Sequence, residues 1–194
     1  ILFDNNNSIG YKDGRFELNR FGFGKKNEKI VITGAVSDNS RDRLKIAFQG
    51  VNIADFNPIL NKFGLEVQGK LNNEVIMWSV LKDFSLESSI NVDDLLINNV
   101  RLGRTKLGLS NKEERNEFLA DIEMKYELPG AKEVVPMRIN GKINPYDSID
   151  NLNLRISMQD FDIKLIETYL SSLFSNIRGK LSTENLAIKG KFSQ

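Results

Sequence analysis

The sequence contains neither cysteine nor histidine, and each absence excludes a class of chemistry. Without cysteine no disulfide can form, so packing and hydrogen bonds must hold the fold together. Without histidine the chain lacks the commonest general base and metal ligand, so a Ser-His-Asp or Cys-His triad is impossible within it. A tetrahedral zinc site is disfavoured for the same reason. We therefore expect a protein that is not an enzyme, with no catalytic residues, no metal and no cofactor.

An excess of charge of one sign is also missing. The chain has 27 basic and 26 acidic residues and a formal net charge of +1. Nucleic-acid-binding proteins need a clustered basic excess, so we expect no nucleic-acid partner. No apolar run reaches the roughly 18 residues of a membrane-spanning helix, and no signal peptide is recognisable. With 40% hydrophobic and 27% charged residues, the composition is that of an ordinary soluble domain.

A five-residue pattern recurs along the chain: an apolar residue, any residue, Gly, Lys and an apolar residue. It begins at Val67, Ile139, Ile177 and Ile188, with a looser copy at Ile32. The pattern alternates as a strand does, with its glycine in phase with the apolar residues. Glycine inside a strand usually marks a bend, a bulge or a close approach by another group. We therefore predict a curved sheet whose inner face is widened by glycines. These are Gly69, Gly141, Gly179 and Gly190.

Alternation of apolar and polar residues dominates the remaining sequence and predicts strands. It is cleanest in residues 121–128 and recurs in 15–19, 44–48 and 152–159. Such strands are half-buried with one wet face, as antiparallel or meandering sheets allow. The alternation also continues through Asn140-Gly141, so we predict a strand there rather than the hairpin turn that Asn-Gly often marks.

Two segments break this period and predict short amphipathic helices. Between Asp55 and Gly64 the apolar residues are spaced as on one helix face, with Asp55 as the expected N-cap and Gly64 as the stop. Residues 162–173 show a second apolar stripe. The expected fold is all-β with two short helices. Its strands form an elongated, curved and mostly antiparallel sheet.

The two helical segments belong to a longer internal repeat. Residues 51–75 align without gaps on 161–185, and Gly69-Lys70-Leu71 matches Gly179-Lys180-Leu181. Repetition of this kind indicates an elongated architecture in which each unit contacts its neighbours. We interpret residues 1–194 as one elongated β-repeat region and expect it to be a fragment of a longer chain.

Residues 165–192 combine a short apolar segment with two glycine strands, around Gly179 and Gly190. Residues 92–103, VDDLLINNVRLG, precede strand-like segments at 105–109 and 118–126. In both features the sequence resembles the TamB/AsmA-like family, over most of residues 40–194. The resemblance implies a long, groove-shaped sheet lined by apolar side chains, known as a β-taco.

The resemblance also implies a location and partners. Family members are anchored in the inner membrane and span the periplasm, where they serve outer-membrane protein assembly and phospholipid transport. The implied partners are phospholipid acyl chains or unfolded outer-membrane protein strands, together with an outer-membrane barrel protein. On this basis we expect a periplasmic conduit whose anchor lies outside this sequence.

The inward-facing residues of the expected strands are suited to cover a lipid tail. Exposing each CH₂ group of such a tail to water costs about 0.8 kcal/mol of free energy. The same faces could instead form the dry core of a closed β-sandwich or β-solenoid with a structural or adhesive role. A carboxylate-based hydrolase would need opposed acids in a cleft, which no pattern indicates. The expected lining residues are Leu44, Ile46, Phe48, Val67, Leu71, Ile122, Met124, Tyr126, Ile139, Ile143, Leu152, Leu154, Ile156, Met158, Ile177, Leu181, Ile188 and Phe192.

Overall fold

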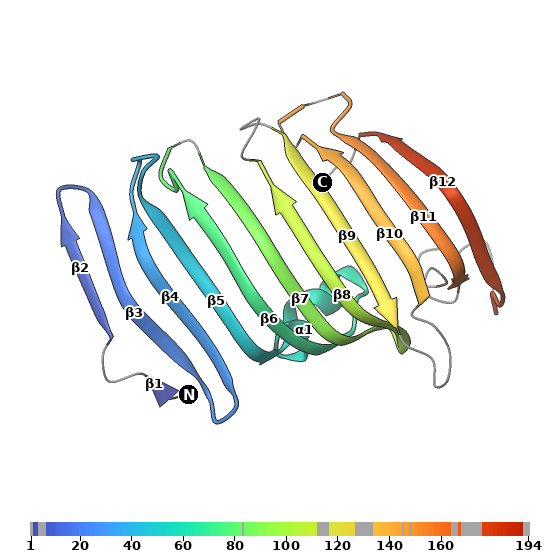
Figure 1. The fold of residues 1–194 in the computed structure, drawn as a ribbon, viewed down its shortest axis with the longest axis horizontal. Helices are drawn as coiled ribbons and strands as arrows, with labels where there is room; N and C mark the ends of the chain where they lie inside the picture. The colour runs from blue at the N-terminus through green and yellow to red at the C-terminus, as the bar shows by residue number, and fades with distance from the viewer. Residues whose placement is uncertain are drawn as a thin grey trace.

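The computed structural model describes residues 2–3, 7–82, 84–111, 117–126, 134–144, 146–147, 149–163, 167 and 176–191. They form one antiparallel sheet in which each strand from β3 to β12 pairs with the next along the chain, while β1 and β2 both pair with β3 (Figure 1). The expectation of an all-β, antiparallel meander is therefore confirmed. The strands are β1 (Leu2–Phe3), β2 (Ser8–Lys12), β3 (Arg15–Lys25), β4 (Glu28–Val36), β5 (Arg43–Asn52), β6 (Val67–Trp78), β7 (Ser85–Ile97), β8 (Val100–Ser110), β9 (Phe118–Tyr126), β10 (Val134–Ile143), β11 (Leu152–Asp162) and β12 (Lys180–Gly190).

The first expected helix is present between β5 and β6. It consists of the 3₁₀ turn η1 (Ile53–Phe56), the helix α1 (Asn57–Leu60) and the 3₁₀ turn η2 (Asn61–Phe63). Gly64 ends it at φ +71°, as predicted. The predicted N-cap was wrong, because the Asn52 side chain accepts the N–H of Ala54, whereas Asp55 accepts a hydrogen bond from Lys25. The second expected helix, in 162–173, lies almost entirely outside the described residues.

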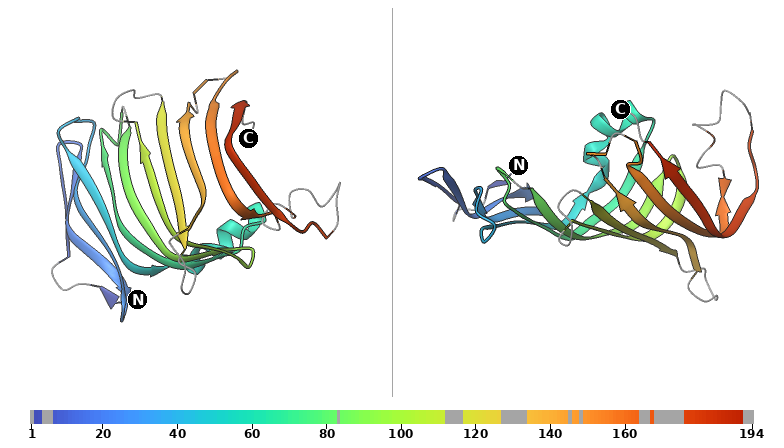
Figure 2. Two further views of the ribbon diagram at one scale, coloured as in Figure 1. Left: turned by 45° about the vertical axis from the view of Figure 1, so that its right-hand side comes forward. Right: turned by 90° about the horizontal axis from the view of Figure 1, so that it is seen from above.

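Bulges interrupt four strands of the sheet, and three of them lie near the end that carries α1. Arg20, Gly50, Asp94 and Asp160 have φ between +49° and +58°, and each lies at a register shift in β3, β5, β7 or β11. A bulge adds one residue to one strand and increases its local twist. These four strands run in the same direction, with the bulges in their middle or C-terminal parts. The resulting sheet is twisted and open, and α1 lies on one side of it (Figure 2).

The bulges of β5 and β11 are built alike. The N–H of Gly50 donates to the Asn72 side chain at 2.7 Å, and the N–H of Asp160 donates to the Ser182 side chain at 2.9 Å. When the internal repeat is extended by one residue at its start, Gly50 matches Asp160 and Asn72 matches Ser182. The strand pairs also match: Val51–Leu71 with Phe161–Leu181, and Asn52–Lys70 with Asp162–Lys180.

The buried core lies against the helical segment at the bulged end. Ile53 of η1 packs on it, together with half-buried residues of the sheet. The accessible surface of 13000 Å² exceeds the roughly 9,300 Å² expected for a compact monomer of this mass. The chain is thus a single sheet layer with a local core rather than a closed sandwich over its described part. The core residues are Val51, Leu71, Val92, Leu95, Val100, Leu102, Met124 and Phe161.

Candidate functional site

One face of the sheet carries an apolar row that crosses every strand from β3 to β12. Each member is the direct partner of the next, so their side chains lie on one face about 5 Å apart. We name this series the central row. Asn73 is its one polar member. The central row consists of Phe23, Ile30, Phe48, Asn73, Ile90, Leu107, Ile122, Ile139, Ile156 and Leu186.

Two further rows flank the central row. The second row lies toward the end without the helix, and the third row lies toward the bulged end and the core. Ser88 and Gly141 interrupt the second row, and Thr105 and Thr183 interrupt the third. The second row is Phe21, Ile32, Ile46, Val75, Ser88, Leu109, Ala120, Gly141, Leu154 and Ile188, and the third row is Val51, Leu71, Val92, Thr105, Met124, Met137, Met158 and Thr183.

Most lining residues expected from the sequence fall in these rows. Leu44, Ile143 and Leu152 belong to the same face, one step beyond the second row. Val67 is buried at the start of β6, and Leu181 pairs with Phe161 at the start of β12. Ile177 is half-buried outside the strands. The side chain of Tyr126 and the whole of Phe192 lie outside the described part. The expected residues within the rows are Phe48, Ile122, Ile139 and Ile156 in the central row, Ile46, Leu154 and Ile188 in the second, and Leu71, Met124 and Met158 in the third.

Burial falls along the rows toward the end of the chain. Val92 is fully buried and Leu71 is 8% exposed, whereas Leu186 and Ile188 of β12 are 43% and 37% exposed. Most other row members are half-buried, since they pack against lateral neighbours while no described layer covers them apart from the helical segment. The face is therefore a partly exposed apolar surface several strands wide.

The recurrent glycines lie on this face with an unusual backbone. At Gly141, φ is +148°, and a Cβ would collide with the backbone of β11 at Asn153. At Gly69, φ is +143°, and a Cβ would lie 2.8 Å from the Val92 side chain. The space next to these two glycines is thus filled by the following strand. Around Gly190, in contrast, no heavy atom lies within 4 Å of the Cβ position.

The opposite face is held by ion pairs. Lys45 lies 2.5 Å from Glu74, and Glu123 pairs with Lys125 and Arg138. Hydrogen bonding from Lys125, and then from Arg138, lowers the pKa of Glu123. A shallow depression of about 450 Å³ is lined by residues of β6 to β9, among them Asn91, Lys106 and Glu123. These polar groups keep this face of the sheet in water.

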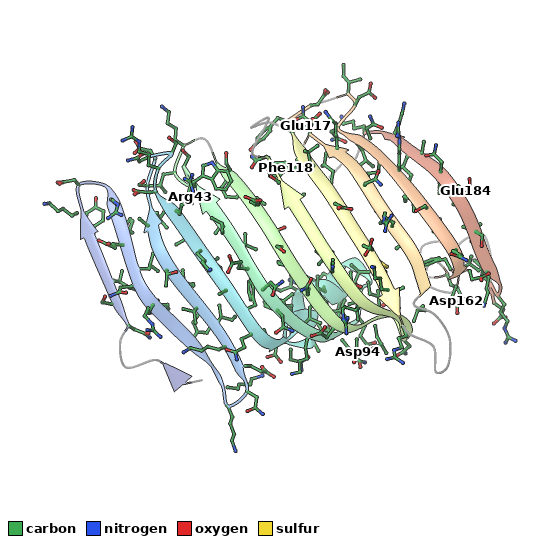
Figure 3. The ribbon with its side chains drawn as sticks, viewed as in Figure 1. Arg43, Asp94, Glu117, Phe118, Asp162 and Glu184 are labelled. Carbon is green, nitrogen blue, oxygen red and sulfur yellow. The ribbon has the colours of Figure 1, made fainter. Side chains whose placement is uncertain are left out.

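Charged residues also mark the strand ends. Arg43 and Glu117 lie at one end of the sheet, and Asp94 and Asp162 lie at the other (Figure 3). The guanidinium of Arg43 stacks over the Trp78 ring at 4.8 Å. The apolar face is therefore bordered by charge at both strand ends.

Sequence reasoning missed the apolar residues of β3, β4, β7 and β8 in these rows. In β7 the alternation is obscured by Ser88-Ser89 and by the bulge at Asp93-Asp94, which shifts the phase. In β3 the bulge at Arg20 has the same effect. The weaker alternation on either side of each bulge was the available signal. The missed residues of these four strands are Phe21, Phe23, Ile30, Ile32, Ile90, Val92, Leu107 and Leu109.

Within the described part of the chain, no group of three or more acidic residues is placed to hold a metal ion. None of the helices described there has the length and apolar character needed to cross a bilayer. No protein-family model, curated protein or solved structure matches the chain.

Proposed function

We propose that this protein is a non-enzymatic component of a bacterial-type cell envelope whose apolar sheet face shields phospholipid acyl chains in transit between membranes. The central row carries the proposal, because it places an apolar side chain on nearly every strand from β3 to β12. Only the helical segment packs on this face within the described residues. In this proposal the face serves as one wall of an apolar groove open to a ligand.

The dimensions of the central row suit an acyl chain. Strands lie about 4.8 Å apart, so a row crossing from β3 to β12 is roughly 43 Å long. A lipid tail spans about half of the roughly 30 Å bilayer core, and several tails could therefore lie along the row. A tail of about sixteen carbons would otherwise face a barrier on the order of 10 kcal/mol in water. Half-buried isoleucine, leucine and methionine side chains can cover the tail and so lower this barrier without any covalent step. Methionine also adapts its shape to a flexible ligand.

The resemblance of residues 40–194 to the TamB/AsmA-like family supports the same role. It favours a periplasmic position in an inner-membrane-anchored protein, with phospholipid as the cargo. It also names unfolded outer-membrane protein strands as a second client and an outer-membrane barrel as a partner. The open antiparallel sheet supports the proposal, whereas Gly69 and Gly141 do not widen the face, because the following strand fills the space beside them.

Native mass spectrometry and lipid extraction test the proposal on protein purified from an envelope-bearing host. We expect phospholipid to remain bound in stoichiometric amount. Ile156→Asp places a charge in the central row and should abolish retention. Ser157→Asp adds the same charge to the next residue, on the opposite face, and should leave retention unchanged.

Circular dichroism of both variants establishes that each still folds. Protein that carries no lipid and also fails to take up a fluorescent fatty acid would overturn the proposal. That result would favour the alternative role, a structural or adhesive module. Loss of lipid in both variants would show that charge alone, and not the apolar face, governs binding.

A further inference from the structure

The central row is interrupted at one place, by Asn73 of β6. Asn73 lies between Phe48 of β5 and Ile90 of β7, which are both half-buried, and is itself exposed. Its side-chain amide has no hydrogen-bond partner within the described residues. An amide carries an NH₂ donor group and a carbonyl acceptor, so both are open to a ligand in the middle of an otherwise apolar row.

The backbone at Asn73 does not by itself require this amide. Its φ of +73° lies in the left-handed region, which both asparagine and glycine adopt. In β8 the same φ of +73° belongs to Gly103, which is buried. The sheet thus has glycine at a buried position of this conformation and asparagine at an exposed one. What distinguishes Asn73 is the polar group that it presents on the apolar face.

A second polar group lies beside Asn73 on the same face. Ser88 of β7 belongs to the second row, diagonal to Asn73, and their Cβ atoms lie roughly 7 Å apart. The Ser88 oxygen accepts the N–H of Leu109 at 2.9 Å, which leaves its own O–H able to donate. We name Asn73 and Ser88 the polar pair. Both can donate hydrogen bonds to one ligand that carries carbonyl oxygens.

We propose that the polar pair binds the ester carbonyls at which the acyl chains of a lipid join its glycerol. This inference rests on the proposed function and adds a fixed position and a specificity to it. A ligand that covers Asn73 must offer it a hydrogen-bond partner, because burying an unpaired amide is unfavourable. A hydrocarbon offers none, whereas ester carbonyls accept from both members of the pair. Because Asn73 is exposed, the headgroup can point from there into water.

The acyl chains have room beside the polar pair. From Ile90 to Leu186 the central row is apolar without interruption. It crosses five strand spacings between β7 and β12, or about 24 Å. One leaflet of a bilayer holds roughly 15 Å of hydrocarbon. A lipid held at the polar pair can therefore lay its tails along this part of the row.

An extended polypeptide fits this part of the face less well. Laid along the row, it would bring a backbone amide to the apolar surface about every 3.4 Å. The central row offers such a chain one polar side chain, Asn73, so most of its amides would be covered without a partner. A single polar pair instead matches a ligand with one polar region and long hydrocarbon tails.

Competition between two phospholipids tests the proposal. One is a diester with identical saturated tails, and the other is its diether analogue, which lacks only the two carbonyl oxygens. The full chain is incubated with vesicles that hold both in equal amounts, and mass spectrometry measures the ratio of the lipids extracted from the protein. We expect the bound diester to exceed the diether at least about threefold. Infrared spectroscopy with isotope-labelled ester carbonyls should show their stretching band lowered by hydrogen bonding to the protein.

A matched pair of variants assigns this preference to Asn73. Asn73→Gly removes the amide and keeps a residue that adopts the left-handed backbone, so it should at least halve the preference for the diester and raise the carbonyl band. The control is Asn99→Gly, because Asn99 is likewise exposed and left-handed, with φ +64°, but lies in the turn between β7 and β8, outside the rows. This control should keep the preference of the parent.

The outcomes separate this inference from the proposed function. Equal binding of diester and diether to the parent, or an unchanged preference in Asn73→Gly, would overturn the inference and leave the proposed function in place. A parent that takes up neither lipid would overturn both. The ratio measured for the parent decides the question even where Asn73→Gly does not fold.

Discussion

At the scale of single residues, Thr105 has the least favourable surroundings for a polar group. It is fully buried, lies between Val92 and Met124 in the third row, and its hydroxyl has no hydrogen-bond partner within the described structure. An unpaired buried hydroxyl costs about 1–3 kcal/mol, and valine has the same shape without it. We expect Thr105→Val to raise the free energy of unfolding by about 1 kcal/mol, measured by urea denaturation.

The matched substitution is Thr33→Val in β4. Thr33 pairs with Lys45 on the opposite, polar face and is half-buried. Its replacement should change the free energy of unfolding by no more than about 0.5 kcal/mol. A decrease in stability for Thr105→Val would show that the threonine hydroxyl has a partner in solution.

Asp42 links β3 to the turn before β5 and makes stability depend on pH. Its carboxylate accepts hydrogen bonds from Arg15 at 2.9 Å and Ser37 at 2.7 Å. Arg15, and then Ser37, lowers the pKa of Asp42. The resulting stability is fully present above the unfolded pKa of about 3.9 and is lost as the pH falls through the lower folded pKa. Asp42→Asn should therefore flatten the loss of stability below about pH 4. Urea denaturation at several pH values measures this, and parallel curves for the two proteins would contradict it.

At the scale of single elements, the sequence predicted strands better than their register. Unbroken alternation marked β9, β10 and β11, and it correctly placed Asn140-Gly141 inside a strand rather than a turn. Three of the four bulges had no comparable signal, because Arg20, Asp94 and Asp160 carry side chains and are held in a left-handed conformation by the pairing around them. Since each bulge shifts the phase, the residues of the apolar rows could be predicted only between bulges.

Gly141 is one of the glycines in the sheet interior whose surroundings leave no room for a side chain. A Cβ there would collide with the carbonyl of Asn153 and the Cα of Leu154, and the backbone φ is already +148°. We expect Gly141→Ala to lower the free energy of unfolding by about 2 kcal/mol. Chemical denaturation measures the effect. Gly10→Ala in β2 is the control, because nothing lies near its Cβ position and the change should be small. Equal effects of the two substitutions would show that β11 can move away from Gly141.

The matched bulges at Gly50 and Asp160 should differ in how much their side-chain hydrogen bond contributes to the free energy of unfolding, although they are built alike. Asn72 accepts the N–H of Gly50 and also donates to Asp93 at 2.9 Å in a partly buried site. Asn72→Ala should cost about 1–2 kcal/mol, because the Gly50 N–H loses its partner away from water. At the exposed bulge of Asp160, water can replace the Ser182 hydroxyl, so Ser182→Ala should cost less than about 0.5 kcal/mol. Thermal unfolding of both variants compares them, and equal losses would contradict the assigned difference in solvent access.

At the scale of the whole molecule, the architecture follows from pairing between strands that are adjacent in sequence. Each strand from β3 to β12 pairs with its chain neighbours, and the large accessible surface reflects the missing second layer. The repeat in residues 51–75 and 161–185 indicated such a linear arrangement. It could not indicate where the rows would be buried, because burial depends on how the bulged end folds around the core near Ile53.

A linear sheet should open from its ends. Most residues of the buried core lie on β6 to β8, while β12 pairs with β11 alone among the described strands and has exposed apolar side chains. In an array with nearest-neighbour contacts, stability is a sum of local terms, so its ends fray independently. We expect amide exchange to be slowest in β6 to β8 and to become faster toward β2 and β12. Leu186→Asp should speed exchange in β11 and β12 and leave β4 to β6 unchanged. Ala187→Asp, on the opposite face of β12, should have little effect. Faster exchange in every strand after Leu186→Asp would instead mean that the sheet unfolds as one cooperative unit, with coupling beyond neighbouring strands.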